Sequence, residues 1–135
     1  VFTIGDGVEV NTNTENYIAY CFHSVEGYSK IGTYEGNGDA DAPFIYTGFS
    51  PAFILLKSAD STSNWPMQDN KRLGYNPAKN LYADEAYTES GTGYMDILSN
   101  GFKPRNETGV PSNASGDTVI YIAFAESPFK YSNAR

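Results

Sequence analysis

The sequence holds a single cysteine, Cys21, and a single histidine, His23. One cysteine cannot form a disulfide within the chain, which excludes the disulfide-stapled class of small secreted domains. Nucleophilic triads and most zinc sites need histidine, and one histidine cannot build a two-histidine metal site within a chain. Cys21 and His23 would share one face of a strand. Because Cys21 lies in an apolar run, we expect a buried core residue rather than a nucleophile.

Charged residues are also scarce, at 19% of the chain, below the usual globular share of about 25%. The formal net charge of −7 disfavours contact with phosphate backbones. The sequence has no Lys/Arg cluster for anionic lipid and no apolar run long enough to span a bilayer. We therefore expect neither a nucleic-acid partner nor membrane insertion.

The chain is rich in the residues that β-sheets and tight turns use. Among its 135 residues, 15% are aromatic, chiefly 11 Tyr and 8 Phe, and 13 are Gly. Apolar runs are short and are separated by turn residues at spacings of about 8–12 residues, which is typical of sandwiches and barrels. The pattern predicts an all-β fold, an antiparallel β-sandwich of jelly-roll or lectin-like order.

The individual runs predict particular elements. Strands are expected at 2–4, 8–10, 17–22, 31–34, 44–46, 52–57, 94–98 and 118–124, with weaker signals at 67–69 and 73–75. A short helix is expected near residues 77–87, because Asn76-Pro77 offers an N-cap followed by proline and apolar residues then recur at helical spacing. Asn37-Gly38 and Asn100-Gly101 supply residues that tolerate positive φ in turns.

The chain contains an internal echo. Tyr17-Ile18-Ala19-Tyr20 resembles Tyr121-Ile122-Ala123-Phe124, and residues 2–7 resemble residues 97–102. The echo divides the chain into closing strands of a preceding unit at 1–30, a linker at 31–43 and a β-sandwich unit at 44–135. Closing strands cannot bury their hydrophobic face alone. They therefore either pack onto the following unit or continue a unit that begins upstream of Val1.

A candidate ligand site surrounds Trp65, the single tryptophan, which lies between Asn64 and Pro66. Aromatic side chains on loops commonly stack on the apolar faces of sugar rings. The nearby Asp69, Asn70 and Arg72 could hydrogen-bond sugar hydroxyls. The alternative is that Trp65 covers the edge of the core.

A weaker candidate is a calcium site at Asp39 and Asp41, which flank Ala40 in a glycine-rich stretch. Calcium takes six to eight oxygen ligands, and the spacing of the calcium-binding EF-hand loop is absent here. A solvated acidic turn is the better interpretation, and we expect no other cofactor. No pair of carboxylates is marked out for glycoside hydrolysis, so we do not expect an enzyme.

Five segments, several of them long, carry a family resemblance: 17–30, 36–38, 43–57, 96–103 and 121–135. They resemble an uncharacterised β-rich repeat domain of structural and tail-fibre proteins of tailed phages, often marine ones. The resemblance implies a component of the virion surface, outside the cell. We expect such a component to contact other virion proteins and host cell-surface glycans. By analogy with tail fibres it also implies a homotrimer. It brings no catalytic residues.

Two other classes of function remain open at this point. A purely architectural subunit of a virion surface or filament would place its many aromatic residues at subunit interfaces, where Tyr and Phe are enriched. A bacterial carbohydrate-binding module would use the same exposed aromatic platform as an adhesin. A shared fold alone does not establish sugar binding.

Overall fold

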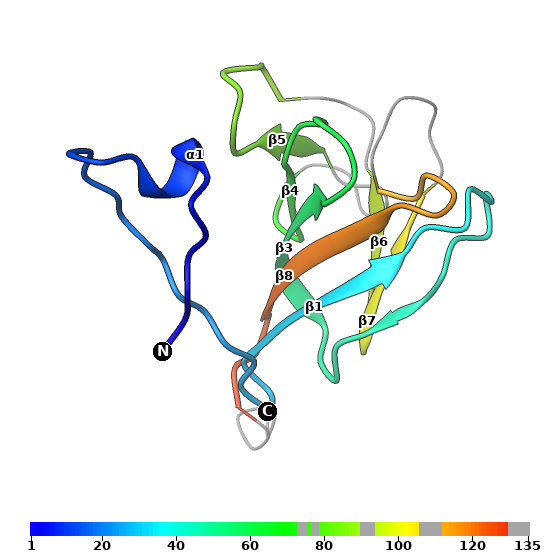
Figure 1. Ribbon diagram of the computed structural model, residues 1–135. Helices are drawn as coiled ribbons and strands as arrows, with labels where there is room; N and C mark the ends of the chain where they lie inside the picture. The colour runs from blue at the N-terminus through cyan, green and yellow to red at the C-terminus, as the bar shows by residue number, and fades with distance from the viewer. Residues whose placement is uncertain (73–75, 77–78, 90–93, 106–111, 130–135) are drawn as a thin grey trace.

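The computed structural model describes residues 1–72, 76, 79–89, 94–105 and 112–129. They form two antiparallel sheets, with strand orders β1-β8-β3-β4-β5 and β2-β7-β6 (Figure 1). The strands are β1 (Ser29–Glu35), β2 (Ile45–Tyr46), β3 (Pro51–Ser58), β4 (Pro66–Asp69), β5 (Asn80–Tyr82), β6 (Met95–Leu98), β7 (Gly101–Pro104) and β8 (Thr118–Ala125). The predicted all-β antiparallel sandwich is confirmed.

The centre of the five-stranded sheet is β8, which pairs with β1 on one side and with β3 on the other. Val119, Tyr121 and Ala123 point into the sandwich and are buried. Because side chains alternate along a strand, Ile120 and Ile122 point to the opposite face. The nearly continuous apolar sequences of β3 and β8 are typical of strands that are covered on both faces.

The core lies between the two sheets. Ile54 and Leu56 from β3 face Phe102 from β7, and all three side chains are fully buried. The Tyr121 ring meets the Phe102 ring edge to face, with 5.4 Å between ring centroids. Each such burial stabilises the fold by about 1.5–3 kcal/mol. The contact therefore joins the two sheets into one cooperative unit.

Two glycines predicted for turns have different roles. Gly38 has a φ of +68°, as expected for a residue in the left-handed region. Gly101 has no positive φ; it is required because a Cβ there would lie 2.1 Å from the carbonyl oxygen of Ile45. The close approach of β2 to β7 thus depends on Gly101 at their pairing.

Polar side chains occupy the free edges of the sheets. The Gln68 amide donates to the Met95 carbonyl (2.6 Å) and accepts from the Met95 N–H (3.2 Å). Asn76 pairs in the same way with Ile97 on β6, at 2.8 and 2.7 Å. The Ser24 hydroxyl satisfies both backbone groups of Ile31 on β1. These bonds block edges that could otherwise pair with another chain.

Residues 1–24, which we call the N-terminal arm, stand apart from the sandwich (Figure 1). The arm contains α1 (Val8–Asn11), and every residue of the arm is exposed. Its own hydrogen bonds hold its bend: the Tyr17 hydroxyl donates to the Val8 carbonyl and accepts from the Thr12 N–H, both at 3.0 Å. Within the described residues, no helix has the length and apolarity needed to cross a membrane.

Several predicted elements are wrong. Residues 2–4 and 17–22 form no strand, residues 8–10 lie in α1, and Cys21 is exposed rather than in the core. These segments have strand-like sequences but no neighbouring strand to pair with, and unpaired strands are unstable in water. The helix expected near 77–87 is also wrong over β5, which pairs with β4 instead.

The remaining predicted strands inside the sandwich are found within one or two residues of their expected bounds, except 73–75, which lies outside the described residues. The range 31–43, interpreted as a linker, contributes most of β1 to the five-stranded sheet. The strand β7 follows a turn that the sequence marked, but its own four residues were not predicted as a strand.

Candidate functional site

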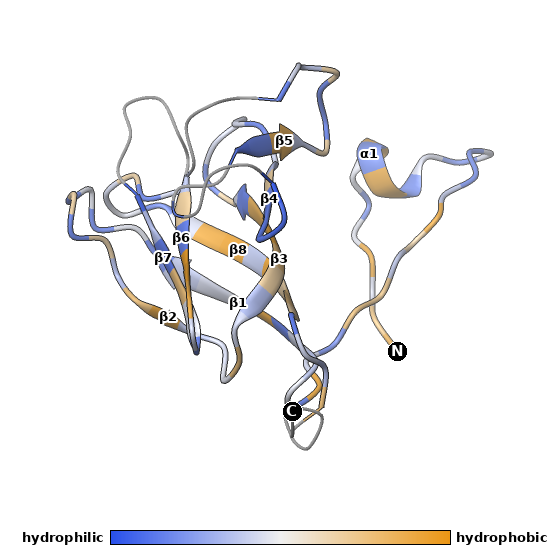
Figure 2. Cartoon of the chain, turned by 180° about the vertical axis from the view of Figure 1, so that it is seen from behind, coloured by the Kyte–Doolittle hydropathy of each residue, from blue (hydrophilic) through white to orange (hydrophobic). Residues whose placement is uncertain are grey.

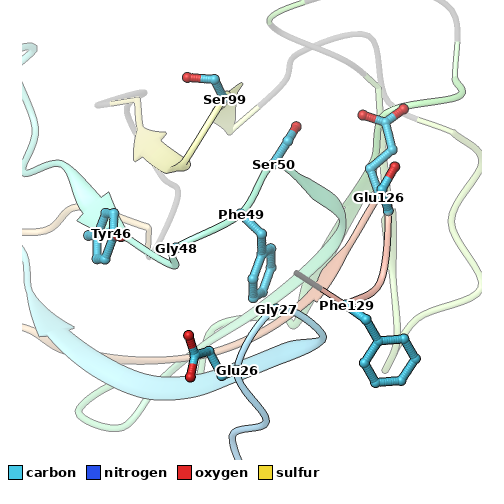
Figure 3. A pocket seen from close by; sticks show the side chains of 10 residues that line it. Glu26, Gly27, Tyr46, Gly48, Phe49, Ser50, Ser99, Glu126 and Phe129 are labelled. Atoms are coloured by element: carbon cyan, nitrogen blue, oxygen red, sulfur yellow. The ribbon is translucent and has the colours of Figure 1, made fainter. Parts of the chain in front are cut away.

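A groove of about 450 Å³ lies at one end of the sandwich. Four separate segments build it: the turn before β1, the connection from β2 to β3, the turn between β6 and β7, and the segment after β8 (Figure 3). Its lining residues are Glu26, Gly27, Tyr46, Gly48, Phe49, Ser50, Ser99, Glu126, Ser127 and Phe129. The groove therefore combines aromatic rings, hydroxyl groups and two carboxylates.

Backbone hydrogen bonds fix the walls of the groove. The Phe129 N–H donates to the Gly27 carbonyl at 2.7 Å, and the Phe129 ring stacks on Tyr28 with 5.7 Å between centroids. The Glu126 N–H donates to the Ser50 carbonyl at 2.8 Å. These bonds attach the segment after β8 to the two neighbouring loops, so the lining side chains are held on ordered backbone.

Aromatic side chains line the groove without being fully buried. Tyr46 is 63% exposed and Phe129 is 60% exposed, whereas Phe49 packs partly against the core. Figure 3 shows Phe49 between Glu26 and Tyr46 on one side and Phe129 on the other. An adjoining hollow of about 360 Å³ shares four lining residues with the groove: Glu26, Gly27, Tyr46 and Gly48. The accessible surface therefore continues past Tyr46.

The groove is acidic. Glu126 forms an ion pair with Lys71, with 2.9 Å between Oε1 and Nζ. The hydrogen bond from Lys71 lowers the pKa of Glu126 below its ordinary value, and a hydrogen bond with Asn70 acts in the same direction. Glu126 is therefore ionised at neutral pH and accepts hydrogen bonds from donors in the groove.

The residues predicted around Trp65 do not form one site. Trp65 is 43% exposed and precedes β4, where its backbone N–H donates to the Asp84 carboxylate at 2.8 Å. Asp69 and Arg72 lie at the other end of β4 and pair with each other at 2.7 Å. Arg72 also pairs with Glu89 at 2.8 Å, so its guanidinium is engaged within the chain.

The fourth predicted residue, Asn70, lies near the groove, where its side chain contributes to lowering the pKa of Glu126. At the calcium candidate, the Asp41 carboxylate forms an ion pair with Lys103, and this hydrogen bond lowers the Asp41 pKa. Asp39 accepts the Asp41 N–H at 3.0 Å. In the described part of the chain, no three His, Cys, Asp or Glu residues gather in a way that could hold a metal.

The sequence did not single out the groove residues, because they come from segments far apart in the chain. One signal was present. The two echoed segments continue into Glu26-Gly27-Tyr28 and Glu126-Ser127-Pro128-Phe129, and these two continuations meet through the bond between Gly27 and Phe129. Their similarity alone did not indicate that they would be neighbours.

The fold and the groove define an antiparallel β-sandwich domain with a groove built from loops at one end. Residues 1–128 match DUF7483, a domain of unknown function, and the chain belongs to this family. The match includes both the N-terminal arm and the sandwich. No curated protein and no solved structure matches the chain.

Proposed function

We propose that the chain is a virion-surface domain, part of a tail fibre or similar appendage, that attaches the particle to its host by binding a cell-surface glycan. The observation that supports glycan binding is the groove itself, where the rings of Tyr46, Phe49 and Phe129 lie beside the carboxylates of Glu26 and Glu126. It is about the size of a site for one or two sugar rings.

The groove chemistry suits neutral or amino sugars. Aromatic rings stack on the apolar C–H faces of pyranoses, while carboxylates and serine hydroxyls accept or donate hydrogen bonds to sugar hydroxyls. The carboxylates of Glu26 and Glu126 would attract a protonated amine and repel a sugar acid, although the ion pair with Lys71 weakens this effect at Glu126. We therefore expect discrimination against sialic and uronic acids, which would place like charges side by side.

Two carboxylates in one groove also raise the question of hydrolysis. Glycoside hydrolases need one carboxyl group that carries a proton at working pH, which requires a raised pKa. Lys71 lowers the pKa of Glu126 instead. Glu126 is therefore suited to accept hydrogen bonds from a ligand rather than to donate a proton to it.

The location on a virion rests on the resemblance to phage tail-fibre proteins. The net charge of −7 is consistent with it, because excess negative charge favours solubility outside a cell. Single glycan contacts are weak, and a homotrimer would raise avidity through several grooves on one particle.

An architectural subunit is the second candidate. The N-terminal arm favours it, because the arm exposes large apolar side chains that a neighbouring subunit could cover. Attachment and assembly involve different surfaces of the chain, so the two functions are compatible.

Glycan-array binding by the chain displayed in many copies tests the proposal. Tyr46→Ala and Phe129→Ala should each weaken binding to the best ligand by about tenfold or more, the usual effect of removing a stacking ring. Trp65→Ala is the matched control and should leave binding unchanged. Loss of binding in Trp65→Ala alone would move the site to Trp65, and absence of any glycan ligand would favour the architectural role.

A further inference from the structure

The outer face of the five-stranded sheet, which points away from the core, carries a row of apolar side chains. One row crosses all five strands in register, from Ile31 to Ile122, Leu55, Met67 and Leu81. Residues directly opposite each other on neighbouring strands share a face, and Ile122 alternates with the buried Tyr121 and Ala123. These five side chains therefore lie together on the outer face.

Further apolar side chains extend this row. Ile120 is 39% exposed, and Phe124 lies opposite Phe53 on β3. Ring contacts join Phe53 to Phe124 at 6.3 Å. The five residues of the row are each partly exposed. Contiguous apolar patches at a protein surface usually mark an interaction surface.

The N-terminal arm is a second exposed apolar surface. Its exposed large apolar residues are Val1, Phe2, Ile4, Val8, Val10, Tyr17, Ile18, Tyr20 and Phe22. Figures 1 and 2 place the arm on the side of the five-stranded sheet, with the three-stranded sheet on the far side of the body. The arm meets this face at one corner, where the Phe22 ring contacts Phe124 at 6.2 Å.

The sequence of the arm explains what it could cover. Residues 17–20 repeat the pattern of residues 121–124, which are apolar on both faces of β8. In the arm the same side chains are exposed, including Ile18 at 82%. The counterpart of this segment, residues 121–124, is buried or partly buried in the sheet, whereas residues 17–20 of the arm are all exposed.

We propose that the arm of one copy of the chain packs over the outer face of a second copy. The hydrogen bonds that Tyr17 donates to Val8 and accepts from Thr12 fix the bend of the arm. The arm stands apart from its own sandwich (Figure 1), so another copy is the fitting partner. The charges agree: residues 1–24 contain Asp6, Glu9 and Glu15 but no Lys or Arg. This inference is independent of glycan binding.

On the receiving face, Lys57 supplies a positive charge, while Asp69 on the same face is paired with Arg72 and Glu35 lies at its far edge. The Lys57 ammonium group donates to the Ser61 and Ser63 carbonyls. Lys57 lies opposite Ile120 in the register of β3 and β8. An acidic arm that crosses Ile120 would therefore meet a positive charge at the same place.

Analytical ultracentrifugation of the full chain over a wide concentration range tests the proposal. We expect reversible association, and we expect Ile18→Asp in the arm and Ile120→Glu on the face each to raise the concentration of half-assembly by at least about tenfold. Both sites are exposed, and a glutamate at 120 could pair with Lys57, so both variants should fold. Asn13→Asp and Ala40→Glu are matched controls for added charge and should associate normally.

Mixing the two impaired variants identifies the partner. The Ile120→Glu copy keeps an intact arm and the Ile18→Asp copy keeps an intact face, so the mixture should associate more strongly than either variant alone. A chain that stays monomeric at all concentrations overturns the proposal. If Cys21 in that monomer also resists alkylation by a thiol reagent, the arm covers the face of its own chain. The proposal is also overturned if Ile120→Glu abolishes association and Ile18→Asp leaves it intact. The outer faces of two copies would then pack directly on each other without the arm.

Discussion

Residues 17–20 and 121–124 have nearly the same sequence and opposite environments. Tyr121 is 4% exposed at the centre of the sandwich, whereas Tyr17 is 47% exposed in the arm. The difference comes from their neighbours: β8 has hydrogen-bonding partners on both sides, and no strand of the described structure pairs with residues 17–20. An apolar pattern therefore defines which faces a segment can bury, while pairing strands decide whether it folds.

The largest expected difference between the two regions comes from matched tyrosine substitutions. Tyr121→Ala removes a ring that packs on Phe102 and Tyr34 and should lower the free energy of unfolding by about 3–5 kcal/mol. Tyr17→Ala should change it by less than about 0.5 kcal/mol, as for other exposed sites. Urea denaturation of dilute protein measures both, and equal losses would mean that the arm is part of the cooperative unit.

Substituting the side chains that block sheet edges should give a smaller difference in the free energy of unfolding between the sandwich and its joint with the arm. Gln68→Met leaves the buried N–H and carbonyl of Met95 without their amide partner and should cost about 2–4 kcal/mol. Ser24→Ala, at the joint of arm and sandwich, should cost less than about 1 kcal/mol, because water can replace the hydroxyl there. The same denaturation experiment applies. A larger loss of unfolding free energy in Ser24→Ala than in Gln68→Met would show that the bond to β1 stabilises the fold more than the bond to β6.

The smallest effect should come from the ion pair that follows β8. The pKa of Glu126 is lower in the folded chain than its ordinary value of 4.5, so Glu126 stabilises the fold at pH values above 4.5. This contribution disappears as the pH falls through the lower pKa of the folded chain. The pair is largely exposed, so the loss should be below about 1 kcal/mol. Lys71→Met should flatten this part of the stability profile, measured between about pH 2 and 6. An unchanged profile would show that the pair contributes nothing.

The sequence was sufficient for the sandwich because its central strands carry strong local signals. The apolar runs of β3 and β8, and the turn at Asn100-Gly101, lie where the pattern placed them. The same rule failed in the arm, where a strand-like run had no partners, and at β5, where pairing with β4 overrode a helical spacing. Neither outcome depends on local sequence.

The candidate site was harder to predict than the fold. Trp65 and Arg72 were chosen as a rare aromatic and a nearby charge, but the structure places them at opposite ends of β4, with Arg72 paired to Asp69. The groove residues Tyr46 and Phe129 are 83 positions apart by their numbers, 129 minus 46. Only the tertiary structure brings such residues together.

Residues 17–20 and 121–124 share a sequence pattern, but only residues 121–124 form a paired strand in the single chain. Hydrogen exchange measured by mass spectrometry tests this central claim most directly. In dilute protein, we expect the amides of residues 118–125 to be strongly protected and those of residues 17–22 to exchange at nearly the rate of an unfolded chain. At concentrations where copies associate, residues 17–22 should gain protection. Strong protection of residues 17–22 in the dilute monomer would contradict the claim, because the arm would then be folded without a partner.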